Sequence, residues 1–291
     1  MGVALFTRHA TREEFIQHRD EARVVREQRY RSVYAVRDWF LVSVNRTVPQ
    51  PVSALIGGVL VGARSQLPKD IVEDFRRTGL SHIMAISGYN ISIISVILMN
   101  MLASLISRRR AFWAVLGILL VFTILTGLQA SVIRAAIMGL FALFAQHMGR
   151  VPTPMHALVI AAAIMVGFDP LILRFDIGFQ LSVLATLGIL TLAPRLQTKF
   201  PEVVAVTISA QLFVLPLIIY YFHTISLISL PANILILPLI PALMLLGFAA
   251  GMTSWIPLIG PVVGFLAWTL GKMILLVVHW FASIPWASIS L

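Results

Sequence analysis

The sequence predicts an all-α fold, a polytopic membrane helical bundle, from three observations. Of its 291 residues, 59% are hydrophobic and only 12% are charged, whereas soluble domains are about a quarter charged. The apolar residues fall into windows of roughly 17 to 25, the length that a helix needs to cross about 30 Å of hydrocarbon. The alternating, turn-bounded segments of about 10 residues that build transmembrane barrels are absent. We therefore expect about eight membrane-spanning helices.

Residues 1–50 form a basic amphipathic segment ahead of the spans. Their charged residues alternate with Phe, Val, Tyr and Trp at helical spacing, as in helices that lie in a membrane interface. We expect an N-terminal interfacial collar over 1–50 and a transmembrane domain over 51–291. The apolar stretch within residues 52–66, about a dozen residues long, is short for a span. We expect it to lie in the interface or to re-enter the membrane.

The predicted spans follow a charged loop. They cover residues 83–106, 111–128, 131–147, 155–168, 178–193, 203–221, 230–252 and 257–284. One end of these spans carries most of the later basic residues: Arg108, Arg109, Arg110, Arg150, Arg195 and Lys199. Because basic loops stay on the cytoplasmic side, we expect this end to be cytoplasmic and both termini to be extracytoplasmic.

The chain is basic, with 22 Lys and Arg against 12 Asp and Glu and a net charge of +10. This charge suits a polyanionic partner such as nucleic acid or anionic lipid, although the bias of cytoplasmic loops accounts for it equally well. The chain has no cysteine, which excludes disulfides, thiolate metal sites and thiol nucleophiles. Its seven histidines are scattered without a metal-binding cluster, so we expect no metal and no cofactor.

Arg134 is the main candidate for a functional residue within a span. A guanidinium in hydrocarbon costs at least about 2.5–3.5 kcal/mol unless it reaches water or a partner. On a helix, Arg134 shares a face with Ser131 and with the small side chains of Ala135 and Ala142. We expect this face to look inward. The alternative is that Arg134 snorkels to the interface or pairs with a backbone carbonyl.

The stretch HIMAISGYNISII, residues 82–94, opens the first span with a polar cluster. Ser87 and Asn90 are three residues apart, so they could line a hydrated path or serve only as hydrogen bonds between helices. His82 stands at the entrance, where it could bind an anion or cap the helix. A neighbouring stripe of small residues favours close helix packing: Gly88, Ser92 and Ser95.

Two later segments have similar features. Gly178 and Ser182 form a small-xxx-small pair that favours helix packing, with the amide of Gln180 between them. Asn233 lies in an apolar run that three prolines interrupt: Pro231, Pro238 and Pro241. Proline removes backbone donors, which a membrane tolerates only where protein or a water-filled cavity satisfies the freed carbonyls. A broken helix beside a pathway and simple proline-kinked packing both fit.

These segments resemble the motifs of the ComEC competence channel family. FRRTGLSHIMAISGYNISII (75–94) is similar to its signature, and ASVIRAAIM (130–138) to its SVLRA motif. DIGFQLSVLATLGIL (176–190) and LPANILILPLIPALM (230–244) are similar to its GFQLSFLA and NLLA-P-P segments. The four motifs occur in the family's order. One departure is GYN, where the family commonly has Leu and His after the glycine.

The resemblance implies the membrane-embedded competence domain, through which single-stranded DNA crosses the bacterial inner membrane in natural transformation. It assigns these motif positions: His82, Ser87, Gly88, Ser131, Arg134, Gly178, Gln180, Ser182 and Asn233. Family members commonly also carry an oligonucleotide-binding-type domain and a metallo-β-lactamase-like domain, a proposed nuclease. Neither fits this sequence, so we expect no enzyme activity from it and, as possible partners, separate domains of these two kinds.

We expect Arg76 and Arg77 to collect the strand outside the membrane and Arg134 to contact its phosphates within. Neutral contacts come from Ser87, Asn90, Gln129 and Gln180 in this hypothesis. The sequence has no GxxxxGK[ST] phosphate loop, so the driving force must come from a cytoplasmic motor or DNA-receptor proteins.

Two other functions fit parts of the pattern. The first is a small-solute or lipid transporter, suggested by Arg134 and the proline-broken segment. The second is an intramembrane serine protease, because ISGYN resembles a GxSG-like nucleophile loop. Ala85 occupies the first glycine position of that loop, and no supporting motif supplies a base.

Overall fold

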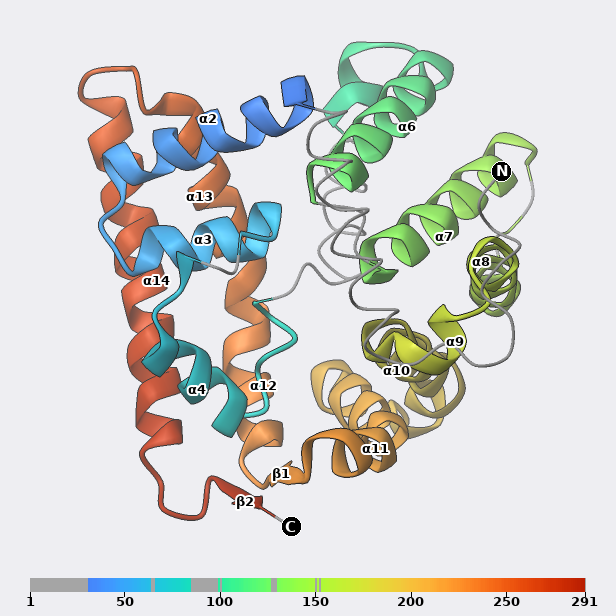
Figure 1. Ribbon diagram of the computed structural model, residues 1–291. Helices are drawn as coiled ribbons and strands as arrows, with labels where there is room; N and C mark the ends of the chain where they lie inside the picture. The colour runs from blue at the N-terminus through green and yellow to red at the C-terminus, as the bar shows by residue number, and fades with distance from the viewer. Residues whose placement is uncertain are drawn as a thin grey trace.

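The computed structural model (Figure 1) describes residues 31–63, 66–84, 99, 101–126, 130–149, 151 and 153–290. Its helices are α2 (Arg31–Thr47), α3 (Val52–Val61), α4 (Lys69–Arg77), α6 (Arg108–Leu125), α7 (Ala130–His147), α8 (Pro154–Phe168), α9 (Ile172–Phe175), α10 (Ile177–Leu196), α11 (Glu202–Phe222), α12 (Ser229–Ile236), η2 (Leu237–Leu239), α13 (Ile240–Thr253) and α14 (Ile259–Ala282). Within these residues, β1 (Thr224–Ser226) and β2 (Ser288–Ser290) are the only strands. The all-α prediction is confirmed.

Four helical segments are long and apolar enough to cross a membrane: α10, α11, Ser229–Thr253 and α14. Three apolar helices are shorter, namely α3, Ala130–Ala142 of α7, and α8. The 15 residues of α8 reach only about 22 Å, less than the hydrocarbon thickness of about 30 Å. The predicted span 83–106 lies mostly outside the described residues. The chain is thus a membrane protein, but the predicted count of about eight spans is not confirmed.

The proline-rich segment is broken, as the sequence suggested. The helix α12 ends at Ile236, the 3-10 turn η2 contains Pro238, and α13 begins with Pro241 in its first turn. Because neither proline can donate a backbone hydrogen bond, regular α-helical bonding is interrupted at this point.

The helices α2, α3, α13 and α14 form one packed group (Figure 1). Every residue of α3 is buried, and its ten residues span only about 15 Å. A helix lying in the membrane interface would leave one face uncovered, so the enclosed position of α3 fits the re-entrant alternative. The described end of the predicted collar, α2, packs across α13 and α14, while the division at residue 50 remains a prediction.

Small residues let these helices approach closely. A Cβ atom at Gly247 of α13 would lie 2.6 Å from Ile56 of α3, and one at Gly264 of α14 would lie 2.5 Å from the Thr47 carbonyl oxygen of α2. At Gly264 the two backbones can therefore meet only because its side chain is a hydrogen atom, whereas Gly247 leaves room for the Ile56 side chain.

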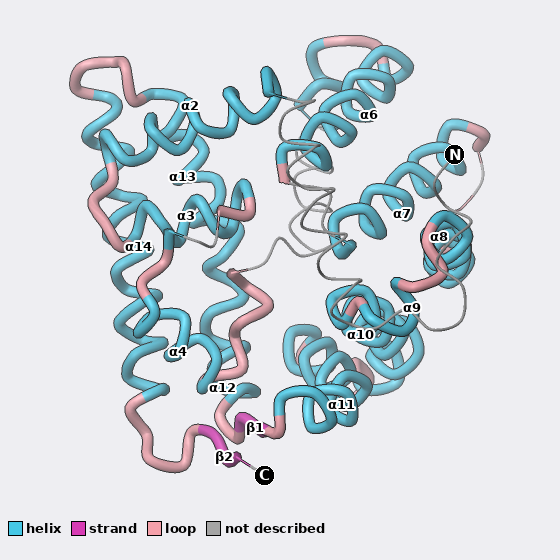
Figure 2. Tube along the Cα trace, in the orientation of Figure 1, coloured by secondary structure: helices cyan, strands magenta, loops and turns pink. Residues whose placement is uncertain are grey.

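The remaining helices include α7, α8, α10 and α11, which pack on one another. In Figure 1, α8, α10 and α11 are seen nearly along their axes, whereas α13 and α14 run in the plane of the view. These three helices are therefore strongly inclined to α13 and α14. Figure 2 shows that β1 and β2 pair close to the C-terminus, with Thr224 opposite Ser290 in antiparallel register.

Candidate functional site

Arg134 lies in the protein interior between α7 and α10. Its residue is only 6% exposed. Its Nη1 group donates to the Ser182 carbonyl oxygen at 3.0 Å and to the Thr186 hydroxyl, both on α10. Its Nε atom is buried and has no hydrogen-bond partner among the described residues. The predicted inward orientation of Arg134 is confirmed, and its side chain does not snorkel to the surface. Its bond to the Ser182 carbonyl is the alternative structural role that the sequence also allowed.

The local sequence explains why α7 can bury a guanidinium. Val132, Ala135 and Ala136 are buried beside it, and small side chains bring the backbone of α7 close enough for the arginine to reach α10. On the α10 side, the Thr186 hydroxyl also donates to the Ser182 carbonyl at 2.9 Å. The Ser182 carbonyl therefore has two side-chain donors, and the arginine is only one of them.

Gly178 is not at a helix–helix contact among the described residues. A Cβ atom there would meet only the Asp176 carboxylate, at 3.1 Å, and Asp176 caps α10 by accepting a hydrogen bond from the Phe179 N–H at 3.1 Å. A close approach of α10 to α11 is instead found at Gly188, where a Cβ would lie 2.5 Å from the Ser209 carbonyl oxygen. Sequence analysis missed Gly188 because no second small residue marks it in the motif.

Gln180 joins α9 to α10. Its Nε2 group donates to the carbonyl oxygens of Leu173 at 2.8 Å and Arg174 at 3.2 Å. Its Oε1 atom is buried with no partner among the described residues. The amide thus satisfies the Leu173 and Arg174 carbonyls, which lie in the last turn of the four-residue helix α9, while its own oxygen has no described partner.

Asn233 is 2% exposed and belongs to a polar network. Its Nδ2 group donates to the Ser229 carbonyl oxygen at 2.7 Å, whereas its Oδ1 atom has no partner in the described part of the chain. The Ser229 hydroxyl accepts from Gln211 of α11 at 2.8 Å and donates to the Ser226 carbonyl at 3.1 Å. The network therefore links α11, β1 and the start of α12.

The loop that follows α4 lies against this network. The Ser226 hydroxyl donates to the Arg77 carbonyl oxygen at 2.7 Å. Gly79 has a φ of +70°, which favours glycine, and a Cβ atom there would lie 2.6 Å from Ser229. His82 is exposed, with its Nδ1 atom 3.3 Å from the Gly79 carbonyl oxygen. The first motif (75–94) and the last motif (230–244) thus come together at Ser229, the first residue of α12.

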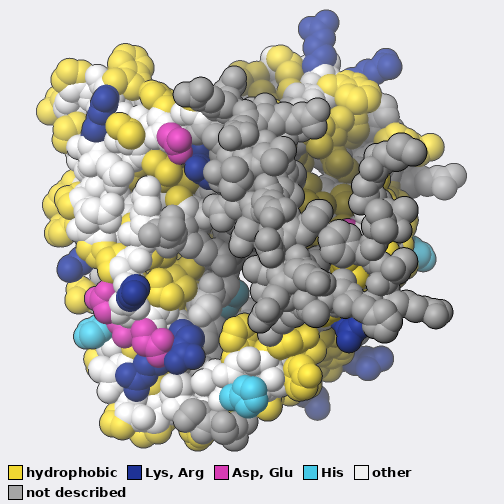
Figure 3. Space-filling view, in the orientation of Figure 1, with side chains coloured by type: hydrophobic (Ala, Val, Ile, Leu, Met, Phe, Trp, Pro, Cys, Tyr) yellow, Lys and Arg dark blue, Asp and Glu magenta, His cyan; other side chains and the backbone are white. Residues whose placement is uncertain are grey.

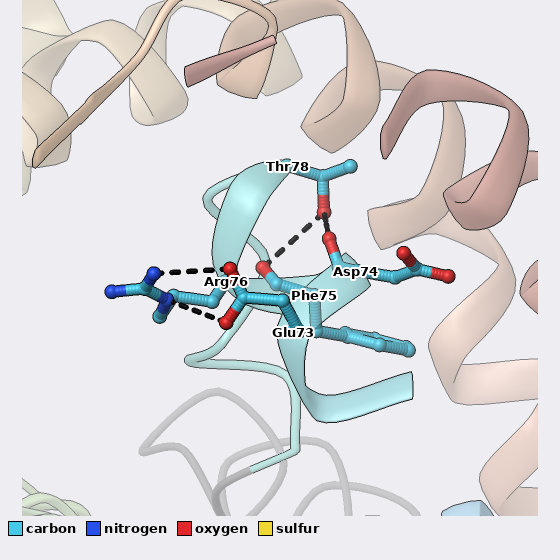
Figure 4. Close-up of polar contacts among 5 residues, drawn as sticks. All are labelled: Glu73, Asp74, Phe75, Arg76 and Thr78. Atoms are coloured by element: carbon cyan, nitrogen blue, oxygen red, sulfur yellow. Dashed lines mark hydrogen bonds and ion pairs between the residues drawn. The ribbon is translucent and has the colours of Figure 1, made fainter. Parts of the chain in front are cut away.

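Of the two arginines of α4, Arg76 has a carboxylate partner, Glu73 (Figure 4). Arg76 forms a two-point ion pair with Glu73, at 2.8 and 3.0 Å. This pairing raises the pKa of Arg76 and lowers the pKa of Glu73 below its ordinary value. In the part of the chain that the structure describes, Arg77 has no carboxylate within ion-pair distance. Of the two arginines predicted to collect the strand, Arg77 is therefore the one whose charge is not offset by a paired carboxylate.

Several predicted site residues cannot be placed. They lie outside the described residues: Ser87, Gly88, Asn90, Ser92, Ser95 and Gln129. Ser131 is half-buried on α7, one turn before Arg134. Their roles remain predictions.

Lys272 is a residue that sequence analysis missed. It lies 13 residues after the start of α14 and 10 before its end, and it is exposed. The sequence alone could have identified Lys272 as a candidate, because a cation inside a predicted span is costly in hydrocarbon, as was argued for Arg134. In the described part of the chain, no group of three His, Asp or Glu side chains comes together to hold a metal ion.

Residues 59–291 match the competence protein family. This chain is a member of that family. It is 28% identical to ComE operon protein 3 of Bacillus subtilis (strain 168) over 225 residues, covering 76% of this chain and 29% of the relative. It is 26% identical to the uncharacterized protein YcaI of Escherichia coli (strain K12) over 225 residues, covering 71% of this chain and 30% of the relative.

The competence protein described here therefore spans less than a third of the length of these curated relatives. No solved structure matches it. The matched region contains Arg134 and the polar networks at Gln180 and Asn233. The resemblance seen in the four motifs is confirmed at the level of the family.

Proposed function

We propose that this competence protein acts in DNA uptake for natural transformation, as an inner-membrane channel that passes single-stranded DNA into the cytoplasm. Family membership over residues 59–291 supports the role in competence. The observation that carries the channel proposal is the inward-facing guanidinium of Arg134 within apolar helices. A strand that bears one charge per nucleotide needs such a cation inside the membrane.

The bonding of Arg134 suits transient phosphate contact. A guanidinium has five N–H donors in a planar fork that matches a phosphate. The described residues occupy one nitrogen, Nη1, and leave the Nε donor without a partner. A guanidinium anchored through Nη1 therefore keeps an unsatisfied Nε donor for a phosphate that reaches it.

In this proposal, the outer surface collects the strand through Arg77, assisted by Arg76, and neutral groups such as Gln180 make weak contacts along the path. Weak contacts allow the strand to advance, because a conducting path must also release what it binds. Direction comes from partners, namely a cytoplasmic motor and DNA-receptor proteins. Separate nuclease and oligonucleotide-binding domains act on the strand, so this chain performs no catalytic step. Both termini of the chain are extracytoplasmic in this proposal.

A second candidate is a small-solute or lipid transporter. The broken segment from α12 to α13, with Pro238 and Pro241 at the break, is the observation that favours it, since discontinuous helices often bind solutes. Uptake of solutes by vesicles containing the purified protein, unaffected by DNA, would support this candidate over the DNA channel.

The test of the proposal is an Arg134 series. Arg134→Ala should insert and fold normally, because the Ser182 carbonyl keeps its bond from Thr186. Arg134→Lys retains the charge, whereas Arg134→Gln retains only hydrogen bonding. If Arg134 contacts phosphate, the Ala and Gln variants should lower transformation frequency by about tenfold to a hundredfold, the equivalent of one charged hydrogen bond, and the Lys variant should retain part of it.

Arg195→Ala is the matched control, since Arg195 is an exposed cation in the last turn of α10. It should leave transformation nearly unchanged. If Arg134→Gln transforms as well as the unmodified protein, the arginine has only a structural role and the phosphate contact is excluded.

A further inference from the structure

Lys272 presents an electrostatic problem that the proposed path does not address. It lies near the centre of α14, one of the four helices able to cross a membrane. Trp280, eight residues further along α14, is exposed, and exposed tryptophans favour the membrane–water interface. Lys272 is then about 12 Å from that interface along the helix axis.

The side chain of Lys272 points outward, on the same face of α14 as the exposed side chains of Leu276 and His279. A lysine at this depth costs at least about 2.5–3.5 kcal/mol in hydrocarbon. Among the described residues, no carboxylate pairs with it. Its four-carbon stem is shorter than the distance to the interface. The face of α14 around Lys272 must therefore meet water rather than lipid.

The neighbouring helix α4 supports the same conclusion. Six of its nine residues are ionisable, and it is attached to α14 by the Asp74 carboxylate, which lies 2.8 Å from Nδ1 of His279. Figure 3 shows charged and histidine side chains gathered over α4 and the adjacent part of α14. Acyl chains cannot cover such a surface without a large desolvation cost.

This surface has an excess of positive charge. Arg76 is paired with Glu73, and Asp74 with His279. The remaining ionisable side chains of α4 and the centre of α14 are Lys69, Asp70, Arg77 and Lys272. Without any contribution from His279, α4 and the centre of α14 hold four cations against three carboxylates, and this net charge of +1 favours an anion.

We propose that α4 and the C-terminal half of α14 line an aqueous vestibule that reaches Lys272, and that Lys272 binds a phosphodiester group there. The water-lined vestibule is independent of the function proposed above. The identity of its ligand rests on that function, since a single strand is the phosphodiester that the channel would carry.

The chain has no cysteine, so single cysteines report on this surface directly. Leu276→Cys lies on the Lys272 face and Leu266→Cys lies about a third of a turn around α14. The two leucines are similarly exposed, at 58% and 50%, and lie six and seven residues from opposite ends of the helix. In intact membranes, a charged thiol reagent should label Leu276→Cys at least about tenfold faster than Leu266→Cys, since only the former meets water. Equal rates would overturn the vestibule.

The ligand is tested by adding a single-stranded oligonucleotide to the Leu276→Cys protein. It should slow labelling about tenfold, as one charged contact predicts, and should not slow it when Lys272→Gln is also present. Comparing each variant with and without oligonucleotide removes the effect of charge on the reagent itself. Unchanged labelling in the Lys272 protein would exclude the phosphodiester ligand. Equal labelling of Leu266→Cys and Leu276→Cys, with the Arg134 series behaving as expected, would reject the vestibule and leave the channel proposal intact.

Discussion

The contact between α2 and α14 offers a quantitative test of the packing. In Gly264→Ala, the new Cβ atom would lie 2.5 Å from the Thr47 carbonyl oxygen and 2.8 Å from the Thr47 Cβ. Because these atoms belong to or adjoin the backbone, α2 itself must move. Overpacking of this kind costs about 1–3 kcal/mol, and replacing a helical glycine by alanine returns about 0.5–1 kcal/mol. We expect a net loss of about 1–2 kcal/mol in the free energy of unfolding.

Thermal unfolding of the purified protein in detergent measures this loss. A decrease of about 1–2 kcal/mol lowers the midpoint by about 2–8 °C for a protein of this size class. Gly117→Ala is the matched control, since a Cβ at this position of α6 meets no described atom within 4 Å. It should raise the midpoint slightly through helix propensity alone. If Gly264→Ala is as well tolerated as Gly117→Ala, then α2 does not pack on α14 as described.

Three further changes test the polar groups. Glu73→Gln removes the carboxylate that pairs with Arg76, so this arginine becomes free to bind a phosphate. The slope of the logarithm of the single-strand binding constant against the logarithm of the salt concentration should then become steeper by about 0.7. Arg76 lowers the pKa of Glu73 in the folded protein below its ordinary value of 4.5. The stability that the pair adds is therefore complete at pH values above 4.5 and is lost as the pH falls through the folded pKa. The free energy of unfolding of Glu73→Gln should lack this pH-dependent loss. Asn233→Leu removes an amide oxygen that has no described partner and one hydrogen bond, from Nδ2 to the Ser229 carbonyl oxygen. Thermal stability should therefore fall by only about 1 kcal/mol, the value of one hydrogen bond, while transformation falls further if the amide oxygen lines the path. Thr186→Val removes the hydroxyl that accepts from Arg134 but leaves the arginine charge in place, so transformation should fall less than in Arg134→Gln. An equal fall would show that the position of the guanidinium, and not its charge, is essential.

Hydropathy and side-chain size predicted much of this structure. The ranges 203–221 and 257–284 correspond to α11 and α14 because long apolar windows have no stable alternative to a helix in a membrane. The inward orientation of Arg134 followed from the cost of placing a guanidinium in lipid. The prolines marked the segment where α12 gives way to η2 and α13 because proline lacks a backbone donor, although the sequence left a break and a kink equally open; Pro238 and Pro241 lie at the break, whereas Pro231 lies within α12.

Contacts between distant segments could not be predicted in this way. The Asp74–His279 pair joins residues 205 positions apart, and no local pattern encodes that distance. The burial of α3 depends on glycines in α13 and α14, namely Gly247, which faces Ile56, and Gly271, which faces Val52. The eight-span count is not confirmed, because apolar windows such as that of α8 show composition but not whether a helix reaches across the bilayer. Lys272 needed no structure, only the rule that was applied to Arg134.

Entry of labelled single-stranded DNA is the most direct test of the central claim. Cells that lack their own channel and carry this protein, with the remaining competence proteins present, should bring the strand into a compartment protected from added nuclease. The Arg134→Lys variant should retain part of this protection and the Arg134→Gln variant should lose it, with equal amounts of protein in the membrane. Full protection with Arg134→Gln, or none with the unmodified protein, would contradict the account.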